Sequence, residues 1–172
     1  MTLFPKKLKK RMASKCITAG SHDDYRIGRT DLPNSMPGPI QLPQSCKIRL
    51  VALGWKHGHI VIDNNNLYSW GTGKSHRLGN ENKMDSEIPI KINDIPPNFD
   101  FKMIQCGDAF SAAISKSGEL LAWGHKYGHK PTRVELPHPA KYLSCGTTAI
   151  CCALEDGSVA CFDESITDKK IH

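Results

Sequence analysis

Apolar residues in this chain occur in short runs that turn-forming residues separate. Runs at 48–54, 101–107 and 141–146 each end in glycine, and each is followed by a second apolar run, a polar turn and a short closing segment. Apolar runs of this length between Gly, Asn, Asp and Pro turns are typical of β-strands. Because no stretch places apolar residues at helical spacing, the sequence predicts an all-β protein.

The same order of strands and turns recurs along the chain. Gly54 and Gly107 are 53 residues apart, and so are Trp70 and Trp123. The third unit follows after only 39 residues, from Gly107 to Gly146, because the loop after the second closing strand is shorter. Repeat folds commonly keep their strands while their loops change length.

A degraded earlier copy of the unit stands at 16–20, which is 51 residues before its counterpart at 67–71. Short strands in repeats of about 40–55 residues predict a β-propeller with one four-stranded sheet per repeat. We therefore expect a partial β-propeller of about three blades over residues 16–163, a basic and disordered tail at 1–15, and a C-terminal tail at 164–172.

Several residues recur at matching places in the units, and we expect them to be structural. Trp70 and Trp123 are expected to fill the space between neighbouring sheets. The full set of predicted repeat positions is Gly54, His57, Trp70, Gly71, Gly79, Gly107, Gly118, Trp123, Gly124, Gly146 and Gly157.

The pattern resembles the regulator-of-chromosome-condensation repeat. The first unit carries the sequences GWKH at 54–57, YSWG at 68–71 and RLG at 77–79. The second unit has Phe110 in the histidine position, and the third has Ala149 there and Phe162 in the tryptophan position. The resemblance implies a propeller, usually of seven blades, that serves as a platform for interactions through variable loops.

Members of that family include an exchange factor for the small GTPase Ran, a plant UV-B photoreceptor, and parts of ubiquitin ligases and ciliary proteins. Exchange in the Ran factor depends on a protruding wedge, and this chain has no insertion long enough to form one. Light sensing needs clustered tryptophans, and only Trp55, Trp70 and Trp123 are present. The resemblance therefore favours a non-enzymatic protein–protein interaction module, with an exchange factor or other regulator of a small GTPase as the alternative.

Excess positive charge is confined to the first 15 residues, at Lys6, Lys7, Lys9, Lys10, Arg11 and Lys15. Removing these six from the 23 basic residues leaves 17, which equals the 17 acidic residues. Such a cluster is typical of a solvated tail, a nuclear localisation signal or a segment that contacts phosphates. It makes chromatin or nucleic-acid binding a second alternative. Because Leu3, Phe4 and Leu8 lie beside the basic residues, attachment to an anionic membrane surface is a further one.

Two motifs suggest other chemistry. Residues 71–75 read GTGKS, but Tyr68 occupies the place of the first phosphate-loop glycine and no helical pattern follows, so we expect no nucleotide site and no cofactor. His57 and His59 share one face of a strand, as metal ligands can, but the sequence identifies no third ligand. His125 and His129 lie in a glycine-containing turn and not at i, i+4 on a helix, so we expect neither pair to bind a metal. No catalytic constellation is present, and we predict a non-enzyme.

Seven cysteines are present without a Cys-x-x-Cys pair, and Cys106, Cys145, Cys151, Cys152 and Cys161 lie in apolar runs. We expect them to pack as small hydrophobic residues and to form no disulfide. With no apolar run near the ~20 residues of a membrane span and no secretory signal, we expect an intracellular protein of the cytoplasm or nucleus.

An arc of about three blades would fall short of the 4–8 blades of a closed propeller. It would leave an apolar face exposed at each end. We therefore expect a protein partner, or a homodimer in which the partial units of two copies complete a six-bladed ring.

Overall fold

The computed structural model describes residues 16–20, 23–30, 36–43, 46–163 and 170–171. The predicted basic tail at 1–15 lies outside the described residues, as does most of the predicted C-terminal tail. Strands dominate the described chain, whose helical elements are three short 3₁₀ turns: η1 (Asp23–Tyr25), η2 (Asp63–Asn65) and η3 (Lys74–His76). The prediction of an all-β protein is confirmed.

Three four-stranded antiparallel sheets form the body of the protein, with strands in chain order. Blade 1 contains β3 (Ile48–Leu53), β4 (His57–Ile62), β5 (Leu67–Gly71) and β6 (Ser86–Ile92). Blade 2 contains β7 (Phe101–Cys106), β8 (Phe110–Ser115), β9 (Leu120–Gly124) and β10 (Gly128–Val134). Blade 3 contains β11 (Ala140–Cys145), β12 (Ile150–Leu154), β13 (Val159–Phe162) and β14 (Lys170–Ile171). A leading unit precedes them, in which β1 (Ile17–Thr18) pairs with β2 (Gly38–Pro39).

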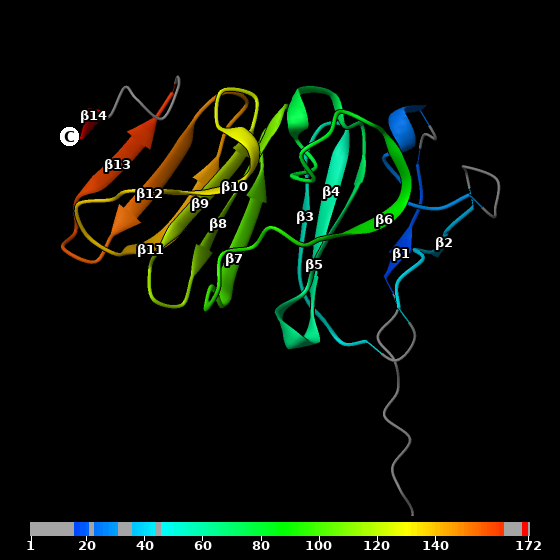
Figure 1. Cartoon of the computed structure of the whole chain (residues 1–172), viewed down its shortest axis with the longest axis horizontal. Coiled ribbons are helices and arrows are strands. Elements are labelled where there is room, and N and C mark those ends of the chain that lie inside the picture. The colour runs from blue at the N-terminus through cyan, green and yellow to red at the C-terminus, as the bar shows by residue number, and fades with distance from the viewer. Residues whose placement is uncertain (1–15, 21–22, 31–35, 44–45, 164–169, 172) are drawn as a thin grey trace, which may run out of the picture.

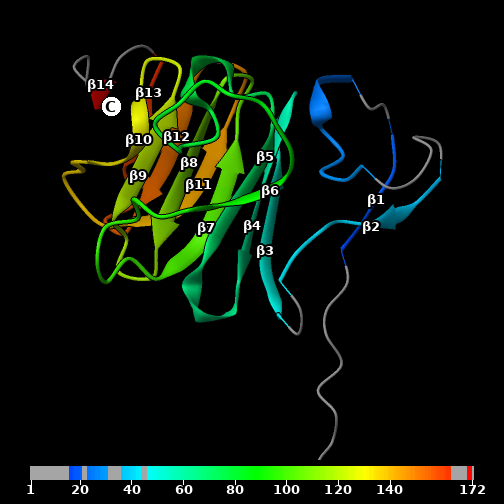
Figure 2. The ribbon, with the colours of Figure 1, turned by 45° about the vertical axis from the view of Figure 1, so that its right-hand side comes forward.

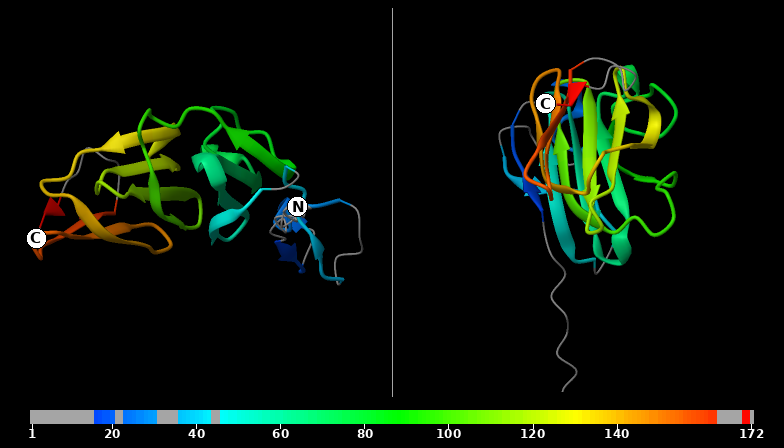
Figure 3. Two further views of the ribbon diagram at one scale, coloured as in Figure 1. Left: turned by 90° about the horizontal axis from the view of Figure 1, so that it is seen from below. Right: turned by 90° about the vertical axis from the view of Figure 1, so that its left-hand side faces the viewer.

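The units stand side by side in a row, with the leading unit beside blade 1 (Figures 1 and 2). Seen from below, the row curves into an arc with the leading unit and blade 3 at opposite ends (Figure 3). The first strands of the blades, β3, β7 and β11, contact one another in sequence. Three blades and a fragment thus form an open arc, as a partial propeller should.

Strand register places the predicted repeat positions at equivalent sites. Trp70 lies opposite Gly58 in blade 1, and Trp123 lies opposite Ser111 in blade 2. Phe162 lies opposite Ile150 in blade 3. The benzyl side chain of Phe162 therefore occupies the place that an indole fills in the first two blades.

Each indole ties its blade to the preceding unit. Trp70 Nε1 donates to the carbonyl of Arg26 at 2.9 Å, and Trp123 Nε1 donates to the carbonyl of Arg77 at 3.1 Å. Both rings are fully buried. Gly79 lies against the second ring, since a Cβ there would come within 2.8 Å of the Trp123 indole, and its φ of +78° favours glycine. The recurring Trp and Gly therefore form the joint between blades.

Apolar clusters fill the three junctions between units. Cys46, Ile60 and Trp70 belong to the cluster between the leading unit and blade 1. The other two lie between blades 1 and 2 and between blades 2 and 3. Strands β4 and β8 are buried along their whole length because neighbours cover both faces of their sheets. In β12 every second residue is only half-buried, because one face of the last sheet has no neighbour among the described residues.

One cysteine prediction is wrong. Cys151 on β12 and Cys161 on β13 lie directly opposite each other, with their Cα atoms 4.2 Å apart, and they form a disulfide. The sequence does not reveal this pair because it depends on strand register, which brings together residues that are ten positions apart. Cysteines that are free among the described residues are Cys16, Cys46, Cys106, Cys145 and Cys152.

Candidate interaction face

The loops that join the first strand of each blade to the second, at 54–56, 107–109 and 146–149, lie at one end of the sheets. The long loop after β5, at 72–85, returns to the same end because the strands are antiparallel. The turn η1 of the leading unit joins them through contacts with Lys56 and Thr72. We call this end of the molecule the loop face. Variable loops on a rigid scaffold are where binding residues usually lie.

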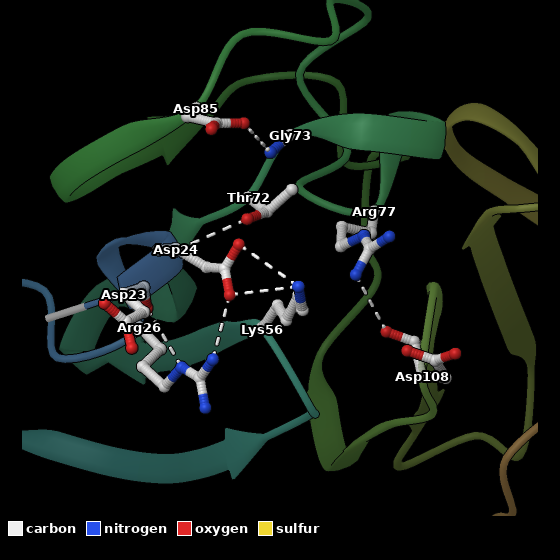
Figure 4. Close-up of polar contacts among 9 residues, drawn as sticks. All are labelled: Asp23, Asp24, Arg26, Lys56, Thr72, Gly73, Arg77, Asp85 and Asp108. Atoms are coloured by element: carbon white, nitrogen blue, oxygen red, sulfur yellow. Dashed lines mark hydrogen bonds and ion pairs between the residues drawn. The ribbon is translucent and has the colours of Figure 1, made fainter. Parts of the chain in front are cut away.

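A small ion network connects the leading unit to blade 1 on the loop face (Figure 4). Asp24 accepts a hydrogen bond from Arg26 Nη2 at 2.8 Å, and Lys56 Nζ lies 3.0 and 3.2 Å from its two carboxylate oxygens. The Thr72 hydroxyl also approaches the Asp24 carbonyl, at 3.4 Å. The hydrogen bond from Lys56, with that from Arg26, lowers the pKa of Asp24 below its usual range.

Arg77 repeats the role of Arg26 one blade further along. Arg77 Nε donates to the carbonyl of Lys74 at 2.8 Å, as Arg26 Nε donates to the carbonyl of Asp23 at 3.0 Å. Arg77 Nη1 then crosses to the first loop of blade 2 and donates to the Asp108 carbonyl at 3.1 Å (Figure 4). Burial lowers the pKa of Arg77, which nevertheless stays protonated at neutral pH. Arg77 therefore links the loops of blades 1 and 2, whereas these side-chain bonds of Arg26 stay within its own unit.

A cavity of about 490 Å³ opens where the three first loops meet, and we call it the mouth. Its glycines let neighbouring loops approach closely: a Cβ at Gly54 would lie 2.7 Å from the Gly107 carbonyl, and one at Gly107 would lie 2.9 Å from the Gly146 carbonyl. The residues that line the mouth are Leu53, Gly54, Trp55, Cys106, Gly107, Asp108, Cys145, Gly146 and Thr147.

Apolar side chains are exposed at both ends of the arc. Along β3, Leu50 and Ala52 pack toward blade 2, so the alternating residues Val51 and Leu53 point toward the leading unit. They are 48% and 64% exposed because the described part of that unit contributes only β1 and β2 beside them. Trp55 follows, also largely exposed. We call Val51, Leu53 and Trp55 the leading-edge surface.

The opposite end of the arc carries a second surface of this kind. Leu143 and Phe162 pack toward blade 2, which leaves Tyr142 and Val159 on the outer face of blade 3, 59% and 44% exposed. The Cys151–Cys161 disulfide alternates with the buried residues of the same strands and is half-buried. We call Tyr142, Val159 and this disulfide the trailing-edge surface.

The two histidines of β4 lie at the junction between blades 1 and 2, beside residues of blade 2 that the sequence did not associate with them. His57 and His59 are buried, and both Nε2 atoms lie 2.8 Å from the Ser111 hydroxyl of blade 2. Cys106, the last residue of β7, completes a group in which one ligand atom from each of the three residues lies within 4.8 Å of the others. The third ligand that the sequence did not identify is therefore present, contributed by the neighbouring blade.

The other residues predicted from the sequence lie outside this histidine–cysteine group. Gly118 and Gly157 occupy turns at the end opposite the loop face, with φ of +83° and +88°. Gly71 and Gly124 end the third strands of their sheets. His129 stacks near His76, with ring centroids 4.2 Å apart. The predicted tail residues Lys6, Lys7, Lys9, Lys10 and Arg11 lie outside the described residues.

Comparison with known proteins gives a consistent result. A family model described as the regulator of chromosome condensation (RCC1) repeat matches residues 64–114. The human E3 ubiquitin-protein ligase HERC2 is 26% identical over 170 residues, which cover 85% of this chain and 4% of the ligase.

Among the described residues, no helix has the length and apolar character that a membrane span requires.

Solved structures show the same fold. Human WBSCR16 superposes with a TM-score of 0.77 and 17% identity over 90% of this chain and 46% of its own. Prp20p from Saccharomyces cerevisiae, whose structure was described with its binding to Gsp1p and histones, gives a TM-score of 0.76 and 17% identity over 90% of this chain and 45% of its own. The chain spans less than half the length of these structures.

Proposed function

The chain is a member of the regulator of chromosome condensation repeat family, and on that basis we propose that it is a non-enzymatic protein–protein interaction module in a regulatory or scaffolding complex. The observation that carries the proposal is the pair of exposed apolar surfaces at the ends of the arc. Inside the arc, the equivalent side chains lie between blades. A partner that covered the edges would bury them in the same way.

Position along the arc accounts for the exposure of these side chains. Val51 is 48% exposed, whereas Ile104, at the equivalent place one repeat later, is 3% exposed because blade 1 covers it. Fully burying a large apolar side chain contributes about 1.5–3 kcal/mol. Two such surfaces are therefore a substantial driving force for association. Lys56 Nζ, 5.8 Å from the Trp55 ring centroid, adds a cation beside the leading edge.

We propose a sheet-like partner for these edges, because each edge continues a stack of β-sheets. One version is a second copy of the chain, in which two arcs complete a six-bladed ring about a two-fold axis. The other version is a different protein that docks a blade or a strand on one edge. In both versions the chain acts inside the cell, in the cytoplasm or the nucleus.

Substitutions at the edges test the proposal. Leu53→Asp and Tyr142→Asp place a charge on the leading-edge and trailing-edge surfaces, and both side chains are already exposed. We expect each variant to fold normally and to lose most of the proteins that cross-link to the wild-type chain in its native cell. Ile88→Asp is the matched control, because Ile88 is 40% exposed but lies on β6, outside both edge surfaces and the loop face. If all three variants capture the same partners as wild type, the edges are not the binding surfaces.

A second candidate is a regulator of a small GTPase. The fold shared with Prp20p, a structure described with binding to Gsp1p, favours it. We expect binding without exchange, because no wedge-like insertion is present. Stopped-flow release of labelled GDP from a Ran-type GTPase measures this directly, and a hundredfold acceleration at micromolar protein would instead establish an exchange factor.

A third candidate is binding to chromatin or nucleic acid through the tail residues Lys6, Lys7, Lys9, Lys10 and Arg11. The Prp20p structure was described with binding to histones as well, which supports chromatin as a candidate partner. The tail carries the formal charge that phosphate contacts require. This candidate is independent of the edges, since the body without the tail is formally neutral.

A further inference from the structure

Histidine and cysteine side chains from two blades meet in the interior, beside the mouth. We propose that His57, His59 and Cys106 form a binding site for a transition-metal ion of the Zn²⁺ class, which would bridge blades 1 and 2. The site does not depend on the proposed function.

Strand geometry places the two histidines on one side of β4. They are two positions apart, so both rings point toward blade 2 while Gly58 between them faces the Trp70 ring of its own sheet. Each Nε2 atom lies 2.8 Å from Ser111 Oγ. Cys106 Sγ approaches the same hydroxyl at 3.9 Å. Three possible ligand atoms, one each from His57, His59 and Cys106, therefore surround the Ser111 hydroxyl between the blades.

The donor set selects the class of metal. Two imidazoles and a thiolate suit Zn²⁺ and its spectroscopic substitute Co²⁺, and no carboxylate of the kind that Mg²⁺ or Ca²⁺ requires belongs to the group. Zinc binds nitrogen at about 2.0–2.1 Å and sulfur at about 2.3 Å, so its tetrahedral ligand atoms stand roughly 3.3–3.8 Å apart. Because the three atoms here lie within 4.8 Å of one another, they would have to draw together by up to about 1.5 Å.

Hydrogen bonding alone does not account for the two histidines. A neutral imidazole carries one N–H and one acceptor nitrogen. The Nδ1 atoms of both rings are buried without a hydrogen-bond partner. Whichever nitrogen carries the proton, one polar atom of each ring is unsatisfied, which is costly in the interior. A metal bond at Nε2 would add a favourable interaction to each ring, although the ring proton would then lie on Nδ1.

The cluster borders the mouth and occurs once among the described repeats. Cys106 is half-buried and lines the mouth, so one member of the cluster lies at a solvent-facing cavity. The equivalent positions of His57 and His59 are Phe110 and Ala112 in blade 2. The ligand set is therefore a feature of the junction between blades 1 and 2 and not of the repeat in general.

Titration of the metal-free protein with Co²⁺ tests the site. We expect one equivalent to bind, with the near-ultraviolet charge-transfer band of a thiolate ligand and visible bands of tetrahedral intensity, and Zn²⁺ to displace it. Cys106→Ser should abolish the charge-transfer band, and His59→Gln should weaken binding at least tenfold. Cys145→Ser is the matched control, because Cys145 ends β11 as Cys106 ends β7 and lines the same cavity but is outside the cluster. It should keep the spectrum.

A second measurement needs no variant. Zn²⁺ should slow the alkylation of Cys106 at least tenfold, measured by mass spectrometry of its peptide, while Cys145 reacts at an unchanged rate. The proposal is overturned if Co²⁺ does not bind below about 100 μM, if the charge-transfer band survives Cys106→Ser, or if Zn²⁺ does not protect Cys106.

Discussion

Asp24 shows how individual residues hold the arc together, since its carboxylate bonds Arg26 within its own unit and Lys56 in the next. Both neighbours lower the pKa of Asp24. A carboxyl whose pKa is lower in the folded state contributes stability above its unfolded pKa, and that stability is lost as the pH falls through the folded pKa. The link between the leading unit and blade 1 should therefore weaken in acid.

Replacing Lys56 tests this assignment. In Lys56→Met the carboxyl of Asp24 should titrate at a higher pH than in the wild-type protein, as followed by carbon NMR. Asp100 serves as the internal control, because Lys116 and Arg49 lower its pKa at a distant place on the surface. An unchanged titration of Asp24 would mean that Lys56 does not stabilise its charge.

At the scale of elements, the joint between blades depends on the buried indole of Trp123 and its hydrogen bond to the Arg77 carbonyl. Trp123→Phe removes the donor and part of the ring, so unfolding in urea should require about 1–3 kcal/mol less free energy. Trp55→Phe changes the same residue type at a site that is 62% exposed and should leave the urea midpoint unchanged. Equal midpoints for all three proteins would show that the indole is not the joint.

Elements were predictable from the sequence to the extent that they repeat. The interval shared by Trp70 and Trp123 located the closing strands, because the same turn and glycine follow each of them. Contacts that depend on strand register or on a single blade junction were not predictable. Cys151 and Cys161 meet through strand register, and Cys106 reaches the histidine pair from the next blade, about 50 positions along the chain. Neither relation leaves a local pattern.

At the scale of the whole molecule, the formal charge of +6 lies entirely in residues 1–15. Any affinity for duplex DNA should therefore disappear when these residues are deleted, and in the intact protein it should fall steeply with salt, because bound phosphates release counterions. Fluorescence anisotropy with a labelled duplex at several salt concentrations measures both effects. Salt-independent binding by the truncated protein would place the nucleic-acid site on the propeller body.

The open arc is the central claim about the molecule. Blade 2 is covered on both faces, whereas apolar side chains of blades 1 and 3 remain exposed at the two ends, namely Val51, Leu53, Trp55, Tyr142 and Val159. Apolar surface of this kind usually marks a contact site. It also leaves the isolated chain less stable than a closed ring, because the end sheets have no neighbours to pack against.

Light scattering coupled to gel filtration tests this claim most directly. We predict that the isolated chain at micromolar concentration elutes with a mass above 19.0 kDa, that of a dimer if two copies close the ring. Failing self-association, it should be unstable until a partner is added. A thermostable monomer of 19.0 kDa that remains well behaved at that concentration would contradict the account, because the arc would then need nothing to cover its edges.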